Sequence, residues 1–125
     1  MNILLVDDTG YIRIILKHVL TAIGFEVVGE ASDGQEAVRM YRSLSPDLVI
    51  MDITMPQMNG LEAVKSIIGY NPDAKIIMCS AMAQRNSVVS CIKAGAKDFI
   101  AKPFEINTVI EVIQRVMEIP IDSKM

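Results

Sequence analysis

The sequence predicts one α/β domain in which a parallel β-sheet is covered by helices on both faces. Five short, almost uninterrupted apolar segments alternate with five segments whose apolar residues recur at helical spacing. The connections between them are short and rich in Pro, Gly, Asn and Asp. Alternating strands and helices favour parallel pairing, and strands without polar positions are typical of a sheet buried on both faces.

The first half of the chain predicts two strand–helix pairs and a third strand. The apolar run 2–6 is a strand that ends at two aspartates, and Thr9 then caps a helix with apolar positions at 12–23, closed by Gly24. Residues 25–30 form the second strand. The turn 32–34 leads into a helix with apolar positions at 37–44, which stops before Pro46. Residues 47–51 form the third strand.

The second half repeats the pattern. Apolar positions at 61–68 predict a helix that ends at the turn 71–73, and residues 74–79 form the fourth strand. The next helix places Val88, Val89 and Ile92 on its apolar face and ends at Gly95. Residues 97–101 form the fifth strand, and positions 106–116 give the last amphipathic helix. The domain is therefore expected to span residues 1–119, with a tail at 120–125.

Composition excludes several classes of function. Hydrophobic residues make up 51% of the 125 residues, aromatic residues only 5%, and Trp is absent, so the core should be aliphatic. The net charge of −3 argues against a nucleic-acid binder. No apolar stretch is long enough for a membrane span, and the N-terminus does not resemble a signal peptide, so a cytoplasmic protein is expected. Cys79 and Cys91 lack metal-site spacing and are expected to be buried free thiols.

Five polar residues follow the ends of the apolar strands. Asp7 and Asp8 follow the first strand, Asp52 the third, Ser80 the fourth and Lys102 the fifth. In a parallel sheet these positions lie at one edge, where ligands of such folds bind. Two like charges ~4 Å apart repel by roughly 4 kcal/mol at an effective dielectric near 20, so clustered carboxylates favour a bound cation. Oxygen ligands alone indicate Mg²⁺ or Mn²⁺.

With a metal present, this set of side chains has the chemistry for phosphoryl transfer. A carboxylate such as Asp52 can attack phosphorus and form an aspartyl phosphate. The cation, the Lys102 ammonium and the Ser80 hydroxyl could then contact the phosphoryl oxygens. More ordinary readings remain open: Asp52 could be a turn former, Lys102 a solvated lysine, and Ser80 a helix N-cap. Phe99 could equally be a core residue.

The motifs resemble those of the response-regulator receiver domain over nearly the whole chain. The resemblance rests on Leu-Val-Asp-Asp at 5–8, Met-Asp-Ile-Thr-Met-Pro-Gln-Met-Asn-Gly at 51–60, Ser-Ala at 80–81 and Lys-Pro-Phe at 102–104, with Ala-Gly-Ala-Lys-Asp-Phe at 94–99. It implies a flavodoxin-like doubly wound (βα)5 fold with strand order 2-1-3-4-5.

The resemblance also implies a role for each site residue. Asp52 becomes the phosphoacceptor for a sensor histidine kinase. Asp8, Asp52 and the backbone carbonyl of Thr54 become Mg²⁺ ligands, with Asp7 reaching the ion through water. Ser80 and Lys102 would hold the phosphoryl group, and the Lys102–Pro103 bond is often cis in the family.

Three further positions are assigned to switching and to phosphate lifetime. Phe99 occupies the place of an aromatic switch residue that turns inward as Ser80 shifts. Met82, two residues past Ser80, and Thr54, two residues past Asp52, would tune the rate of dephosphorylation.

The expected function is a stand-alone, monomeric signalling switch that acts by protein contact, in chemotaxis, on a flagellar motor switch protein. Its output surface would be formed by the fourth helix, the fifth strand and the fifth helix, and a phosphatase is a further expected partner. One alternative is a phosphorelay intermediate or the receiver fragment of a longer, DNA-binding regulator. Another is a Mg²⁺-dependent phosphatase, which the Thr at position 54 disfavours because such enzymes use a second acid or base. Flavin binding is disfavoured by the aspartates after the first strand.

Overall fold

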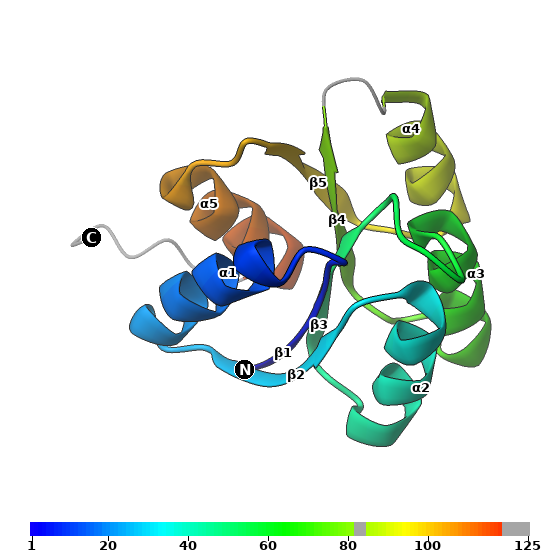
Figure 1. The fold of residues 1–125 in the computed structure, drawn as a ribbon, viewed down its shortest axis with the longest axis horizontal. Coiled ribbons are helices and arrows are strands. Elements are labelled where there is room, and N and C mark those ends of the chain that lie inside the picture. The colour runs from blue at the N-terminus through cyan, green and yellow to red at the C-terminus, as the bar shows by residue number, and fades with distance from the viewer. Residues whose placement is uncertain (82–84, 119–125) are drawn as a thin grey trace.

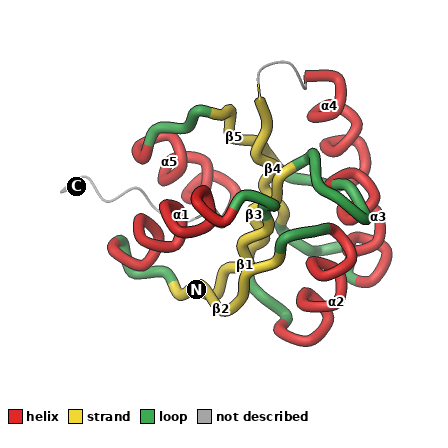
Figure 2. Tube along the Cα trace, viewed as in Figure 1, coloured by secondary structure: helices red, strands yellow, loops and turns green. Residues whose placement is uncertain are grey.

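A computed structural model describes residues 1–81 and 85–118 as a three-layer α/β sandwich (Figures 1 and 2). The chain alternates strands and helices throughout. In order these are β1 (Asn2–Val6), α1 (Gly10–Ala22), β2 (Glu26–Ala31), α2 (Gly34–Leu44), β3 (Leu48–Asp52), α3 (Gly60–Tyr70), β4 (Ile76–Ala81), α4 (Arg85–Ala94), β5 (Asp98–Lys102) and α5 (Ile106–Met117). Every predicted strand and helix is present.

All strand pairs are parallel, and the sheet has the order β2-β1-β3-β4-β5. This confirms the flavodoxin-like fold. Because β1 pairs with both β2 and β3, the winding changes direction between β1 and β3. In open α/β sheets this switch point, at the carboxyl ends of the strands, is where ligands bind.

Helices α1 and α5 cover one face of the sheet, and α2, α3 and α4 cover the other (Figure 1). Each face has its own core. Successive residues of β1 point to opposite sides, as the period of two requires, so that Leu4 and Val6 pack under α2–α4 while Ile3 and Leu5 pack under α1 and α5. The buried residues are aliphatic, as the composition predicts.

Local signals explain where the helices begin and end. Asp33 and Asn59 accept hydrogen bonds from the backbone N–H three residues ahead and so cap α2 and α3. Thr9 occupies the N-cap position of α1, as predicted, but makes no side-chain capping bond. Gly24 and Gly95, with φ of 99° and 125°, follow α1 and α4 in a left-handed conformation that other residues rarely adopt.

Four strand ends differ from the prediction, because β2, β3, β4 and β5 each continue one or two residues further. Asp52 is the last residue of β3, Ser80 lies within β4, and Lys102 is the last residue of β5. Backbone pairing continues through them, since Asp52 is opposite Cys79 and Ala81 is opposite Lys102. These polar residues therefore belong to the strands and do not follow them, and the N-cap interpretation of Ser80 is wrong.

The predicted apolar faces of three helices are partly wrong. In α4, Val88 is buried together with Cys91, whereas Val89 and Ile92 are 47% and 40% exposed. Leu44 of α2 and Ile106 of α5 are also exposed. Cys79 and Cys91 are buried free thiols, as expected. Met82 and the tail 120–125 lie outside the described residues, and among the described ones no helix has the length and apolar character of a membrane span.

Candidate functional site

Three carboxylates meet at the carboxyl edge of the sheet, beside the β1–β3 switch point. Asp7 and Asp8 follow β1 directly, and Asp52 ends β3, the neighbouring strand. Ligand oxygens of the three residues lie within 4.8 Å of one another. Asp7 and Asp52 are buried, with 2% and 7% of their surface exposed, whereas Asp8 is exposed. The structure thus brings together the acidic cluster expected from the sequence.

Lys102 supplies a positive charge to this cluster from β5. Its Nζ atom lies 2.8 Å from Asp7 Oδ2 and 3.5 Å from Asp52 Oδ1. The lysine is therefore a bridge between two buried carboxylates and not a solvated side chain. Its closer partner is Asp7, a contact between residues 95 positions apart that the sequence does not indicate.

Asp7 is held at each of its polar atoms. Its N–H donates to the Ala31 carbonyl at 3.0 Å, and its Oδ1 accepts from the Thr9 N–H at 2.8 Å. Its carbonyl accepts a hydrogen bond from Nη1 of Arg13, on the first turns of α1. Arg13 also pairs with Glu30 of β2 at 3.4 Å. Sequence reasoning missed Arg13, although a charge within the apolar run 12–16 was an available signal.

Burial and neighbouring charges shift the ionisation of the cluster. Desolvation raises the pKa of Asp52; the charge of Lys102 opposes this, and those of Asp7 and Asp8 add to it. Burial alone would lower the pKa of Lys102. Its hydrogen bond to Asp7 and the charges of Asp52 and Asp7 outweigh that effect and raise the pKa of Lys102. One ammonium thus stabilises a cluster that still has an excess of negative charge.

The donor set fits a hard divalent cation. Mg²⁺ prefers carboxylate, carbonyl and water oxygens, and the site offers three carboxylates, one of them facing solvent. Burial, the main cause of the raised pKa of Asp52, makes the ionised form of this carboxylate costly, and the charges of Asp7 and Asp8 add to that cost. A cation between the carboxylates would lower that cost.

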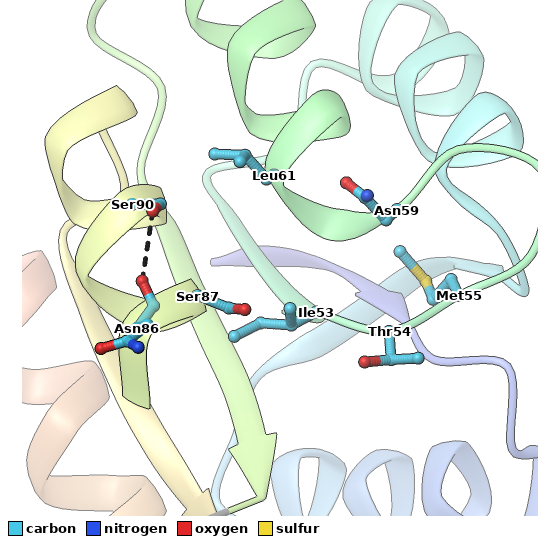
Figure 3. Close-up of a pocket in the computed structure, with 8 residues that line it drawn as sticks. All are labelled: Ile53, Thr54, Met55, Asn59, Leu61, Asn86, Ser87 and Ser90. Carbon is cyan, nitrogen blue, oxygen red and sulfur yellow. Dashed lines mark hydrogen bonds between the residues drawn. The ribbon is translucent and has the colours of Figure 1, made fainter. Parts of the chain in front are cut away.

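The loop between β3 and α3 forms one side of an open pocket of about 470 Å³ (Figure 3). Thr54, Met55 and Asn59 line it from the loop, and Asn86 and Ser87 from α4. Thr54, two residues after Asp52, is exposed and is one of the residues that line the pocket. Solvent therefore has access to the region that follows the end of β3.

A second cavity lies between β4, β5 and α4. It measures about 340 Å³ and is lined by Ser80, Ala81, Arg85, Val88, Val89, Phe99 and Ala101. Ser80 is 3% exposed, whereas Phe99 is 45% exposed. The interpretation of Phe99 as a core residue is therefore wrong, and an apolar cavity lies beside its ring.

Asp98, the first residue of β5, joins the beginning of that strand to α5. Arg115 donates two hydrogen bonds to Asp98 Oδ2, at 2.9 and 2.7 Å, and Asp98 Oδ1 accepts from the Phe99 N–H at 2.8 Å. The Lys102–Pro103 bond is cis, as the resemblance implies.

Comparison with known families and proteins gives a consistent result. The response regulator receiver domain family matches residues 3–114. The chain is 54% identical to the chemotaxis protein CheY of Thermotoga maritima, over 92% of this chain and 96% of that protein. It is 51% identical to the chemotaxis protein CheY of Bacillus subtilis, over 93% and 97% of the two chains.

Solved structures show the same fold. CheY in the CheX–CheY–BeF3–Mg²⁺ complex of Borrelia burgdorferi is 36% identical, with a TM-score of 0.89, over 93% of this chain and 88% of that one. The response regulator domain of Thermotoga maritima CheB is 33% identical, with a TM-score of 0.87, over 97% and 98%.

Proposed function

The chain belongs to the family of response regulator receiver domains, and from that membership we propose that it is a CheY-like, phosphorylation-activated switch of a two-component system. Asp52 is the phosphoacceptor, and a sensor histidine kinase is the donor. The single observation that carries the assignment is the position of Asp52, buried at the switch point within 4.8 Å of two other carboxylates and 3.5 Å from an ammonium group.

Mg²⁺ is the cofactor, and Mn²⁺ would serve the same oxygen ligands. Asp8, Asp52 and the Thr54 backbone carbonyl would hold the ion directly, and Asp7 would hold it through water. The ion supplies charge neutralisation at the carboxylates and at the phosphoryl oxygens. The homologue from Borrelia burgdorferi, crystallised with Mg²⁺ and BeF3, supports this choice of ion.

The side chains of the protein position the reacting groups. An Asp52 carboxylate oxygen forms the new bond to phosphorus, the N–P bond of the donor phosphohistidine breaks, and the imidazole retains the electron pair and takes up a proton. Lys102, charged and already beside Asp52, and the Ser80 hydroxyl hold the phosphoryl oxygens. The protein thereby assists its own phosphorylation and, with water as acceptor, its own dephosphorylation. Thr54 and Met82 would set the rate of that second step.

The signal leaves through the surface formed by α4, β5 and α5. Phe99, Val89, Ile92 and Ile106 are exposed apolar residues on these elements. Movement of Ser80 towards the phosphoryl group would let the Phe99 ring enter the neighbouring cavity, which changes this surface. The identity to chemotaxis CheY proteins favours a role in chemotaxis. We propose a flagellar motor switch protein as the cytoplasmic target, a phosphatase as a further partner, and a monomeric protein.

Incubation with Mg²⁺ and acetyl phosphate, followed by intact-mass measurement, tests the proposal. The wild type should gain ~80 Da, the mass expected for an aspartyl phosphate, and the gain should vanish with EDTA. Asp52→Asn should give no adduct. Asp73→Asn, an exposed aspartate in the turn between α3 and β4, is the matched control and should react like the wild type. A folded wild-type protein that never gains the adduct would refute the assignment.

A further inference from the structure

Helix α2 touches the loop that follows the phosphoacceptor through a glycine. The N–H of Gly34, the first residue of α2, donates to the Met58 carbonyl at 2.9 Å. A Cβ atom on Gly34 would lie 2.1 Å from that same oxygen and 2.7 Å from the Met58 carbonyl carbon. Both are backbone atoms, so no side-chain rotation could relieve the overlap. Only glycine permits this contact.

The first turn of α2 is a fixed support for the loop. Asp33 Oδ1 accepts from the Glu36 N–H at 2.8 Å, and Glu36 Oε1 accepts from the Ser32 N–H at 3.2 Å. The two bonds join the first turn of α2 to the residues just before it and so fix the entry of the chain into the helix. Gly34 itself is buried. Displacing it would require the capped end of the helix to move.

The opposite side of the loop is fixed by β3 and α3. The Gly60 N–H donates to the Ile53 carbonyl at 2.7 Å, and a Cβ on Gly60 would lie 2.5 Å from the Asp52 carbonyl oxygen. The loop from 53 to 59 is therefore held at its two ends by its own flanking elements. Gly34 adds a contact from a separate helix, close to the end of the loop that joins α3.

We propose that Gly34 is a positioning residue for the metal site. By seating Met58 it sets the path of the loop that carries Thr54, and so the place of the Thr54 carbonyl relative to Asp52 and Asp8. The inference rests on the proposed Mg²⁺ site, because it concerns the geometry of one of the ligands assigned there. It adds α2, which provides no ligand, to the elements that determine Mg²⁺ affinity.

The test is the Mg²⁺ affinity of Gly34→Ala, measured by isothermal titration calorimetry at a temperature where circular dichroism shows the variant folded. We expect a Kd about tenfold weaker than that of the wild type, the low end of what loss of an outer supporting contact costs a metal site. Gly69→Ala is the matched control, since Gly69 lies within α3 and a Cβ there would meet nothing within 4 Å. Its Kd should equal that of the wild type.

Three results would overturn the inference in distinguishable ways. A folded Gly34→Ala with a Kd within twofold of wild type would show that the contact is structural only, even if its Tm falls. A wild type that does not bind Mg²⁺ would remove the metal assignment and the role of Gly34 together.

The third result does not depend on a variant and applies if Gly34→Ala fails to fold. In the wild type, saturating Mg²⁺ should slow hydrogen exchange of the Gly34 amide several-fold, while the Asn71 amide at the end of α3 stays unchanged. If Mg²⁺ changes the exchange rates of the two amides equally, the inference is overturned.

Discussion

At the β1–β3 switch point, inside the sheet, Asp7 is held at its N–H, its carbonyl and both carboxylate oxygens, and Lys102 bridges it to Asp52. At the β4–β5 end of the sheet, Phe99 and Val89 are 45% and 47% exposed and line a cavity of about 340 Å³. The two regions belong to one sheet, yet the side chains of the first are fixed and those of the second are loosely packed. The groups proposed to meet phosphorus are thus pre-positioned, whereas the surface proposed to change shape has unfilled space beside it.

The largest expected effect is a difference in stability loss between substitutions at two neighbouring residues of β5. Ile100→Ala should lower the free energy of unfolding by about 3 kcal/mol, because Ile100 is 1% exposed in the core under α1 and α5. Phe99→Ala should cost less than about 1 kcal/mol, since the Phe99 ring is half exposed. Urea denaturation of both variants measures the difference. Similar losses would mean that the β4–β5 end is packed as firmly as the core.

Removal of Lys102 should reveal the electrostatic cost of burying the acidic cluster. Lys102→Met should lose about 2 kcal/mol of stability in Mg²⁺-free buffer at pH 7, because Asp7 and Asp52 then remain buried without a cation. Adding Asp7→Asn should recover part of the loss. Lys97→Met, at an exposed position just before β5, is the control and should change little. If the double variant is no more stable than Lys102→Met alone, the bridge between Lys102 and Asp7 is contradicted.

Asp52→Asn should stabilise the metal-free protein by about 1 kcal/mol at pH 7. Burial raises the pKa of Asp52 in the folded state, so the folded protein retains this proton at pH values where the unfolded chain has lost it. Stability therefore falls as the pH rises from the ordinary value of 3.8 through the raised pKa, and the Asn variant escapes this loss.

Urea midpoints between pH 4 and 8 provide the measurement for this variant. The gain from Asp52→Asn should shrink towards the acid limit, and Mg²⁺ should stabilise the wild type more than the variant. A gain that is independent of pH would contradict the electrostatic origin.

The smallest effect is expected for Arg115→Ala. Arg115 is 64% exposed, so its pair with Asp98 should contribute no more than about 0.5 kcal/mol to stability. Hydrogen exchange at the Phe99 amide should nevertheless become faster, because Asp98 Oδ1 accepts from that amide and loses its support from α5. A loss above about 1.5 kcal/mol would show that the β4–β5 end is held more firmly than its exposure indicates.

The fold could be predicted well because apolar periodicity distinguishes strands from helices directly. All ten elements and the acidic cluster follow from it, since polar residues at the ends of parallel strands must meet at one edge. The errors at the ends of β3 and β5 have a common cause. Asp52 and Lys102 interrupt an apolar pattern, but the backbone bonds to β4 continue through them, and backbone pairing does not depend on side-chain polarity.

Contacts between distant residues could not be predicted in this way. The Lys102–Asp7 bridge depends on how strands β5 and β1 are placed across the site, and the Gly34–Met58 contact depends on the packing of α2 against a loop. In the sequence Gly34 indicated only a turn. The exposure of Val89 and Ile92 likewise follows from the rotation of α4 about its axis, which puts Cys91 inward.

The two free thiols lie in different cores. Cys79 is buried in the core under α1 and α5, where desolvation raises its pKa to about 12, and Cys91 is buried in the core under α2–α4. Because only a thiolate reacts rapidly with alkylating reagents, neither should be modified while its layer is closed. Site-resolved alkylation rates would therefore report separately how often each helical layer opens, with no label introduced into the protein.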